Sequence, residues 1–274
     1  MEILIYAFMI NAFIAGNIIA ILASVSGPFI VLRRYAMLTE TLAHVALVGV
    51  AVGIVTEQNP IWMAVLVSVL SAWLIEYLRS YLGIYSDSIL AIFLSGSLAL
   101  AVIIVSMAGS FNASLFSYLF GSILLVTQED LITMSLFGSL SMAVLLGLFK
   151  EFYFIAFDEE VAQVSGLRVN LLNFTLVTII AVIIALSIRV VGTLLIGALM
   201  VIPTISALRY RLGFSKTIFL SLLFSLFSLF SLFSLLSLSF LSLFSLSLSL
   251  SLSLSLFSLS LSLSLSLSDR KSVV

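Results

Sequence analysis

The chain has 274 residues, of which 63% are hydrophobic and only 8% carry a charge. Because a soluble domain carries about 25% charged residues, this composition indicates an integral membrane protein. The net charge of −1 argues against a nucleic-acid partner, which requires a basic surface. The chain has no cysteine, so metal ligands would have to be His, Asp, Glu, backbone carbonyls or water, a set that suits zinc, manganese or iron.

The apolar stretches of the sequence predict an all-α, multi-pass membrane bundle. A membrane-spanning helix needs about 20 apolar residues. Seven stretches are expected to span the membrane: residues 5–32, 36–55, 61–78, 89–107, 131–149, 171–188 and 190–208. The first is too long for the apolar core of a signal peptide and has no basic residue before it, so we expect it to be a span. A shorter apolar piece, 115–126, is expected to be a half-helix or a re-entrant segment buried in protein.

Basic residues between the predicted spans favour an N-terminus on the outer side of the cell membrane. Cytoplasmic loops are enriched in Lys and Arg. Such residues follow the first, third, fifth and seventh stretches: Arg33, Arg34, Arg79, Lys150, Arg209, Arg211 and Lys216. If residues 115–126 do not cross, all of these residues face the cytoplasm, as does the loop 151–170. Arg189 is the exception, because it falls in a tight turn on the outer side.

The only histidine of the chain, His44, lies in an apolar stretch four residues after Glu40. This spacing places both side chains on one face of a helix. Within a membrane, a carboxylate and an imidazole are costly unless they are paired, hydrated or bound to a cation. Two readings stay open from these residues alone. They form a transient metal site, or Glu40 lies near the cytoplasmic interface while His44 bonds to a backbone carbonyl of a neighbouring span.

Other residues in the spans have candidate roles in binding or packing. Two ligands do not hold an ion, and Glu76, near the end of the third stretch, is the best candidate for a further metal ligand from a second helix. An equal alternative for Glu76 is that its side chain reaches towards the membrane interface beside Arg79. Gly49 and Gly53 form a small-xxx-small pair, which lets another helix approach closely. Asp130 precedes a span and is expected to cap its helix.

The predicted cytoplasmic loop contains an acidic segment that is typical of a short helix. Asp158 is a candidate N-cap, Glu159 and Glu160 suit a helix N-terminus, and Gly166 is a candidate C-cap. The alternative reading is a solvated turn between two spans.

Residues 219–268 contain only Leu, Ser and Phe, with long runs of strict Ser-Leu alternation. All three residues have pyrimidine-only codons, so our hypothesis is that this tract translates a nucleotide repeat and that residues 269–274 are a foreign tail. The alternative is one or two membrane helices, although period-two alternation gives no packing face on a helix. We therefore expect a transport domain at residues 1–218 that is truncated at its C-terminal side.

Four segments, in order, together resemble one family, the membrane permeases of ABC importers for zinc, manganese or iron. The segments read RRYAMLTETLAHVALVGVAVG at 33–53, SYLFGSIL at 117–124, FDEEVAQVSGL at 157–167 and RVVGTLL at 189–195. The resemblance covers residues 5–215. The chain departs from the family pattern at three positions: Glu40 stands where the family usually has Asp, Ala43 where it has Ser, and Val48 where it has Pro.

The resemblance implies a fold of about eight or nine spans and a transport function. It favours the metal role for Glu40 and His44, with a divalent ion as the transported substrate. It implies that the acidic segment, with Asp158, Glu159, Glu160 and Gly166, docks a cytoplasmic ATPase subunit. An external metal-binding protein and a second permease copy are the further partners. Because the chain has no G-x-x-x-x-G-K-[ST] sequence, ATP hydrolysis is expected in the separate subunit, and the chain is expected to be neither an enzyme nor the holder of a permanent cofactor.

An ion-coupled secondary metal transporter is the alternative, because it could use the same carboxylate and imidazole. Such a protein would show acids on several spans and an internal repeat, and acids within the predicted spans are sparse here. An intramembrane metalloprotease of the His-Glu-x-x-His type is excluded, because the chain has one histidine. In both transporter readings the protein is a multi-pass protein of the cell membrane.

Overall fold

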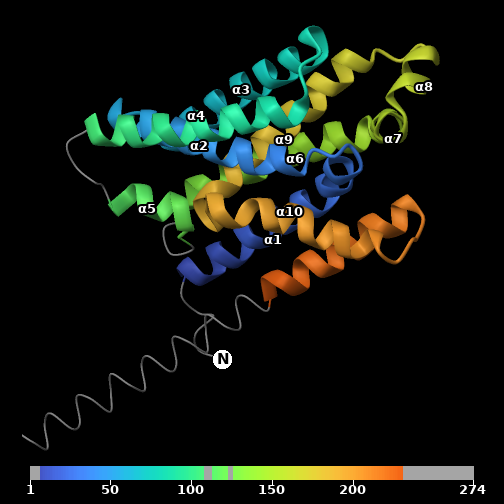
Figure 1. The fold of residues 1–274 in the computed structure, drawn as a ribbon. Coiled ribbons are helices and arrows are strands. Elements are labelled where there is room, and N and C mark those ends of the chain that lie inside the picture. Colours follow the sequence, from blue (N-terminus) through green and yellow to red (C-terminus); the bar gives the residue numbers. More distant parts are fainter. Residues whose placement is uncertain (1–6, 108–112, 123–125, 231–274) are drawn as a thin grey trace, which may run out of the picture. The chain divides into compact units, whose positions relative to one another are not determined.

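The structure, a computed structural model, describes residues 7–107, 113–122 and 126–230. Residues up to Leu226 form one compact unit. Its described residues are helical and contain no strand (Figure 1). The helices are α1 (Ala7–Leu32), α2 (Ala36–Val55), α3 (Pro60–Leu82), α4 (Ser86–Met107), α5 (Ala113–Phe120), α6 (Gln128–Gly147), α7 (Phe149–Phe157), α8 (Glu159–Val164), α9 (Val169–Val191) and α10 (Thr193–Leu208).

Six of the described helices are long and apolar enough to cross a membrane, and they correspond to the first six predicted stretches. The six are α1, α2, α3, α4, α6 and α9. The prediction of a seventh span at 190–208 was wrong in its bounds and length. Helix α9 continues through Arg189 to Val191, and α10 then has only 16 residues. The helical conformation is interrupted at Gly192, between α9 and α10. Its φ of 80° and ψ of 165° are accessible essentially to glycine alone.

The remaining predicted segments are covered only in part. Of the predicted half-helix 115–126, residues 123–125 lie outside the described residues, and the described part is the eight-residue helix α5. A further apolar helix, Phe214–Phe230, includes the beginning of the Leu/Ser/Phe tract. The rest of that tract, 231–268, and the tail 269–274 lie outside the described residues.

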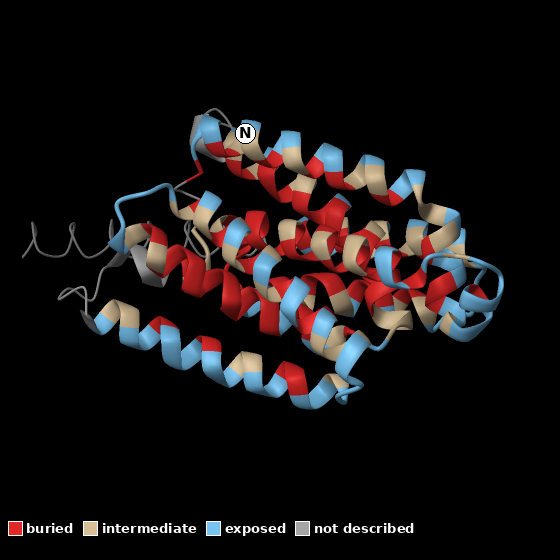
Figure 2. Cartoon of the chain, turned by 90° about the horizontal axis from the view of Figure 1, so that it is seen from above, coloured by how far each residue is buried: buried red, intermediate tan, exposed pale blue. Residues whose placement is uncertain are grey.

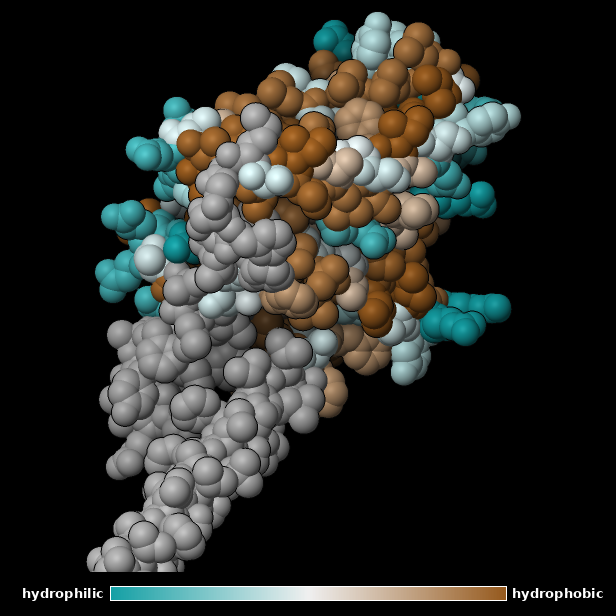
Figure 3. Space-filling view, turned by 60° about the vertical axis from the view of Figure 1, so that its left-hand side comes forward, coloured by the Kyte–Doolittle hydropathy of each residue, from teal (hydrophilic) through white to brown (hydrophobic). Residues whose placement is uncertain are grey.

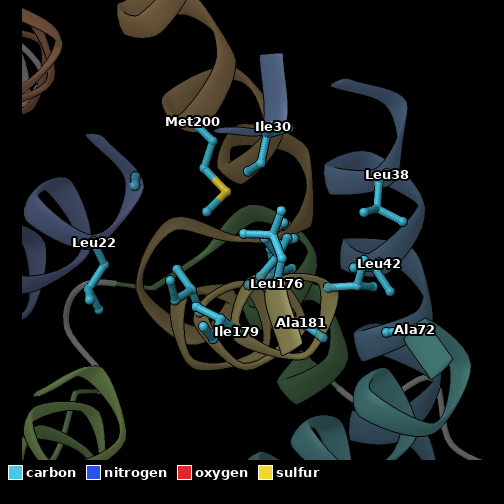
Figure 4. Close-up of a cluster of buried hydrophobic side chains, with 14 of the residues drawn as sticks. Leu22, Ile30, Leu38, Leu42, Ala72, Leu176, Ile179, Ala181 and Met200 are labelled. Atoms are coloured by element: carbon cyan, nitrogen blue, oxygen red, sulfur yellow. The ribbon is translucent and has the colours of Figure 1, made fainter. Parts of the chain in front are cut away.

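Helices α2 and α9 are the most buried of the candidate spans. Figure 2 shows that buried residues gather on the inward-facing sides of the helices. Helix α2 packs against α3, α4, α9 and α10, and α9 also contacts α1, α3 and α6. Leu38 and Leu42 of α2 belong to the same buried cluster as Leu176 and Ile179 of α9 and Met200 of α10 (Figure 4). This core fixes the relative positions of α2 and α10, the two helices that carry the candidate site.

The peripheral helices expose apolar side chains, as a bilayer requires. Ile92, Val102 and Ile103 of α4 are each more than half exposed. Figure 3 shows that hydrophobic residues cover most of the face in view, with hydrophilic side chains towards its margins. The short helix α8 and the half-helix α5 lie at opposite ends of the bundle (Figure 1). In the orientation predicted from the basic residues, the α8 end is cytoplasmic.

Candidate functional site

Glu40 and His44 line one groove between α2 and α10. The groove has a volume of about 390 Å³, and Thr193, Gly197 and Val201 contribute from α10. Gly197 of α10 faces α2, because a Cβ atom at this position would lie in ordinary contact, 3.4 Å, with the Thr39 Oγ1 atom. The spacing of four residues therefore places Glu40 and His44 where the sequence predicts, on one face of α2. We call this space the α2–α10 groove.

The two side chains differ in exposure. His44 is only 7% exposed, and its Nδ1 atom has no hydrogen-bond partner among the residues that the structure describes. Glu40 is exposed, so its carboxylate is accessible from the groove. A buried polar nitrogen without a partner costs free energy and is uncommon in folded proteins. The predicted alternative, in which a backbone carbonyl satisfies His44, is therefore not present at Nδ1.

A neutral imidazole nitrogen and an ionised carboxylate are suitable ligands for a divalent transition metal. Within the described ranges, no group of three or more His, Cys, Asp or Glu side chains is close enough to hold an ion. The α2–α10 groove thus offers two side-chain ligands, and water or backbone oxygens would have to complete the coordination.

Glu76 does not join this pair. It lies on α3, is 1% exposed, and accepts two hydrogen bonds from Arg79, from Nε at 3.1 Å and from Nη2 at 2.7 Å. It lines a different, smaller pocket, to which neither Glu40 nor His44 contributes. The role of Glu76 as a further ligand therefore stays a prediction, and in this structure its carboxylate is engaged by the guanidinium one turn along the same helix.

Arg79 also connects α3 to the acidic segment. Its Nη2 atom lies 3.5 Å from Glu159 of α8, and Arg33 at the end of α1 lies 3.0 Å from the same carboxylate. Asn173 of α9 donates a hydrogen bond of 2.7 Å to Glu159 and accepts one from Arg33. We call Arg33, Glu76, Arg79, Glu159 and Asn173 the ion-pair network. Its four charged members carry no net charge, because two guanidiniums face two carboxylates.

The network alters the ionisation of Glu159 and surrounds an aromatic ring. Burial alone would raise the pKa of Glu159, but Arg33, Asn173 and Arg79 together hold that pKa below its ordinary value. The guanidinium carbons of Arg33 and Arg79 lie 5.2 and 5.3 Å from the centre of the Tyr35 ring, within the range of a cation–π contact. Tyr35 immediately precedes α2, and burial raises the pKa of its phenol.

The acidic segment folds as a short helix with distinct ends. The Asp158 carboxylate accepts a hydrogen bond of 3.0 Å from the Val161 backbone N–H at the start of α8. Gly166 follows the helix with a φ of 84°, and the N–H of Leu167 then donates to the carbonyl of Ala162. Asp158 and Gly166 therefore shape α8, while Glu160 is exposed and its side chain forms no hydrogen bond or ion pair with the described residues.

At the opposite end of the bundle, Arg189, the exception to the predicted distribution of basic residues, forms an ion pair. Its guanidinium lies 2.5 Å from Asp130 of α6, and Asp130 also forms a capping box with Thr127. The backbones of Gly121, after α5, and Gly192 approach so closely that a Cβ atom on Gly192 would lie 2.4 Å from the Gly121 nitrogen. For the ion pair between Arg189 and Asp130, the only signal in the sequence is the isolated basic residue Arg189, because Asp130 is 59 residues away.

The two glycines singled out on α2 face α3. A Cβ atom on Gly49 would lie 2.6 Å from the Ala64 Cα atom, and one on Gly53 would lie 2.8 Å from the Pro60 Cα atom. Real Cβ contacts are essentially never that short, so any larger residue would force the two helices apart.

Taken together, six candidate spans among the described helices and a groove that holds a carboxylate and an imidazole define a multi-pass membrane protein with a candidate binding site. A match to the ABC 3 transport family covers residues 5–263 of the chain. The chain therefore belongs to the ABC 3 transport family. This membership excludes the alternative of an ion-coupled secondary transporter, and it identifies a membrane permease that is not an enzyme.

Individual relatives are similar over most of their length. The chain is 38% identical over 220 residues to a protein of Treponema pallidum named "Probable metal transport system membrane protein", covering 80% of this chain and 82% of that protein. It is 31% identical to the manganese import system permease protein ScaB of Streptococcus gordonii, over 79% of this chain and 77% of ScaB. It is 30% identical to the high-affinity zinc uptake system membrane protein ZnuB of Haemophilus influenzae, over 75% and 78% respectively.

A solved structure has the same architecture. PsaBC from Streptococcus pneumoniae, determined in complex with Fab, superposes with a TM-score of 0.72 and 29% sequence identity. The match covers 82% of this chain and 80% of that chain. The predicted fold class, an all-α multi-pass membrane bundle, is thus confirmed, as is the membrane location.

Proposed function

We propose that this permease is the membrane subunit of an ABC importer that moves a divalent metal ion, zinc, manganese or iron, into the cytoplasm. The observation that carries the proposal is the α2–α10 groove, where Glu40 and the unpartnered Nδ1 atom of His44 lie together. The names of the relatives support a metal substrate, and they include both zinc and manganese systems. They do not choose between these ions, because both accept mixed nitrogen and oxygen ligands.

In this proposal the ion binds transiently to Glu40 and His44 while the bundle alternates between outward and inward access. The imidazole must be neutral and the carboxylate ionised to bind the ion, and the ion in turn offsets the cost of burying both groups. Glu76 takes no part, since its carboxylate is bound by Arg79 in the described conformation. Gly49 and Gly53 contribute by letting α3 pack closely on the helix that carries both ligands.

The proposed partners are those that an importer of this class needs. A cytoplasmic ATPase subunit hydrolyses ATP and docks on the acidic segment that contains Asp158, Glu159, Glu160 and Gly166. An extracytoplasmic metal-binding protein delivers the ion, and a second copy of the permease completes the pathway. The position of α8 at one end of the bundle, opposite α5, supports a docking role for that end.

Metal uptake tests this function and its site separately. Cells that produce the chain with its ATPase subunit and its extracytoplasmic metal-binding protein are given radiolabelled zinc, manganese or ferrous iron, and uptake is compared among the parent, His44→Ala and Glu40→Gln. We expect ATP-dependent uptake of at least one ion by the parent and a loss of about tenfold or more in both variants. Glu129→Gln is the matched control, because Glu129 is an exposed carboxylate at the start of α6 and should not affect uptake.

The possible failures have different meanings. If the parent imports none of the three ions, the proposed function is wrong. If the parent imports an ion and both variants import it equally well, the function stands and the assignment of Glu40 and His44 is wrong.

A further inference from the structure

One carboxylate of the acidic segment is bonded to the spans, although the side chain that carries it, Glu159, is 40% exposed. Glu159 lies 3.0 Å from Arg33 and 3.5 Å from Arg79, and it accepts a hydrogen bond of 2.7 Å from Asn173. These three partners come from the end of α1, from α3 and from α9. Glu160, the next residue, is exposed and has the same charge. Adjacent carboxylates on one short helix therefore have different surroundings.

Helix α8 depends on such contacts for its position. It has only six residues, and a helix of that length is not stable by itself in water. Ala162, at 0% exposure, packs the inner side of α8 against the protein, while Val164, at 90%, lies on the outer side. Among the acidic residues of the segment, Asp158 is engaged in capping α8 and Glu160 is exposed. Glu159 is thus the charged residue that joins α8 to the spans.

The contacts of Glu159 lead to the helix that carries the metal ligands. Arg33 and Arg79, which both pair with Glu159, also lie over the ring of Tyr35. Tyr35 precedes the first residue of α2, and Glu40 lies in the second turn of that helix. The Arg33 side chain is 4% exposed and that of Glu159 is 40% exposed, so solvent screens this ion pair only from the side of Glu159. A displacement of α8 would change the balance of charge at the start of α2.

We propose that Glu159 is a positioning residue that couples movement of α8 to α2 through Arg33, Arg79 and Tyr35, and that it is not part of the surface that binds the ATPase subunit. This inference rests on the proposed function and refines it. The ATPase contacts the outer side of α8, where Glu160, Val161 and Val164 are exposed. Glu159, on the inner side, transmits the resulting movement.

A spin label tests the structural part of this inference without any partner. Because the chain has no cysteine, Val164→Cys provides a single labelling site on the exposed side of α8. In the purified full-length chain, Glu159→Gln should increase the mobility of the label, and Glu160→Gln, with the same change of charge, should leave the mobility unchanged. Equal mobility in the parent and in Glu159→Gln would overturn the inference.

Uptake and ATP hydrolysis measured in the same membranes test the coupling part. Glu159→Gln should still co-purify with the ATPase subunit as the parent does, while the number of ions moved per ATP hydrolysed falls by about fivefold or more. Glu160→Gln should keep the parental ratio. Loss of co-purification in Glu159→Gln would show that Glu159 belongs to the docking surface, and an unchanged ratio would show that it transmits nothing. Either result overturns the inference.

Arg33→Gln removes the other member of the Arg33–Glu159 ion pair, so it should reproduce the effects of Glu159→Gln if those effects come from the pair. Both variants should raise label mobility and lower the ratio if the pair transmits movement. Glu159→Asp, which keeps the charge, should recover part of the ratio. If the parent itself moves no metal ion, the proposed function fails, while the label measurement still decides whether Glu159 holds α8.

Discussion

Two regions of this bundle contain buried polar side chains, and they differ in whether those side chains have partners within the chain. In the ion-pair network, the buried Glu76 and the half-exposed Glu159 are both paired with arginines. In the α2–α10 groove, His44 is also buried, and its Nδ1 atom has no partner in the part of the chain that the structure describes. Groups that satisfy one another stabilise a fold, whereas an unsatisfied group is available to a ligand.

The comparison explains why charge alone does not identify a transport site. Glu40 and Glu76 are both carboxylates near the predicted cytoplasmic ends of spans, and the residues alone make each a candidate ligand. Arg79, three residues after Glu76, engages the Glu76 carboxylate, while Glu40 remains exposed beside His44. The network should therefore matter for stability and the groove for transport.

The largest expected effect is on stability, in the network. Arg79→Gln leaves the 1% exposed carboxylate of Glu76 without its partner, and breaking a buried ion pair costs about 3–5 kcal/mol. Thermal unfolding of the purified chain in detergent measures the loss. Arg168→Gln is the control, since Arg168 is exposed and its replacement should change the melting temperature little. Equal melting temperatures for Arg79→Gln and Arg168→Gln would contradict the claim that the ion-pair network stabilises the fold.

A smaller effect of opposite sign is expected in the groove. His44→Leu replaces a buried nitrogen that lacks a partner with an apolar side chain, so we expect the chain to become more stable by about 1 kcal/mol. The same variant should lose metal uptake. The unfolding assay used for Arg79→Gln measures this change, and a marked destabilisation would show that His44 is a structural residue whose partner forms in the membrane.

The smallest expected effect is a dependence of stability on acid pH. The folded-state pKa of Glu159 is lower than its ordinary value, so the unfolded chain binds more protons as the pH falls. The stabilising contribution of Glu159 is complete above the ordinary pKa and is lost as the pH falls through the lowered, folded-state value. Melting temperatures from neutral pH to about pH 3 should fall more steeply in the parent than in Glu159→Gln. Parallel curves would contradict the pairing with Arg33, Arg79 and Asn173.

Much of the fold follows from the sequence, because a run of about 20 apolar residues is a local property. The first six predicted spans correspond to helices in the structure. The prediction of the seventh span is wrong in its bounds because a lone charged residue, Arg189, is not a boundary between spans. Its charge is neutralised by Asp130 on another helix, and the true break is at Gly192, where the backbone of Gly121 approaches. Neither contact leaves a pattern within a local window.

Helix periodicity predicts one part of the candidate site, the residues that share a face of a single helix. The four-residue spacing placed Glu40 and His44 on one face, but only the structure shows that α10 lies opposite that face. For Glu76 the spacing to Arg79 was itself a signal of an ion pair within the helix. For Glu159 the sequence holds no such signal, because Glu159 and Glu160 cannot be told apart until the surrounding helices are known.

The most direct test of the central claim uses the single histidine of the chain. With isotope-labelled histidine, the nuclear magnetic resonance signals of the imidazole nitrogens can come only from His44. A weak site can then be titrated with zinc. We predict that zinc shifts the Nδ1 signal of the parent, that Glu40→Gln greatly weakens this response, and that Glu76→Gln, if it remains folded, retains it. Imidazole signals of the parent that stay unchanged at saturating zinc would contradict the claim that the α2–α10 groove binds the transported ion.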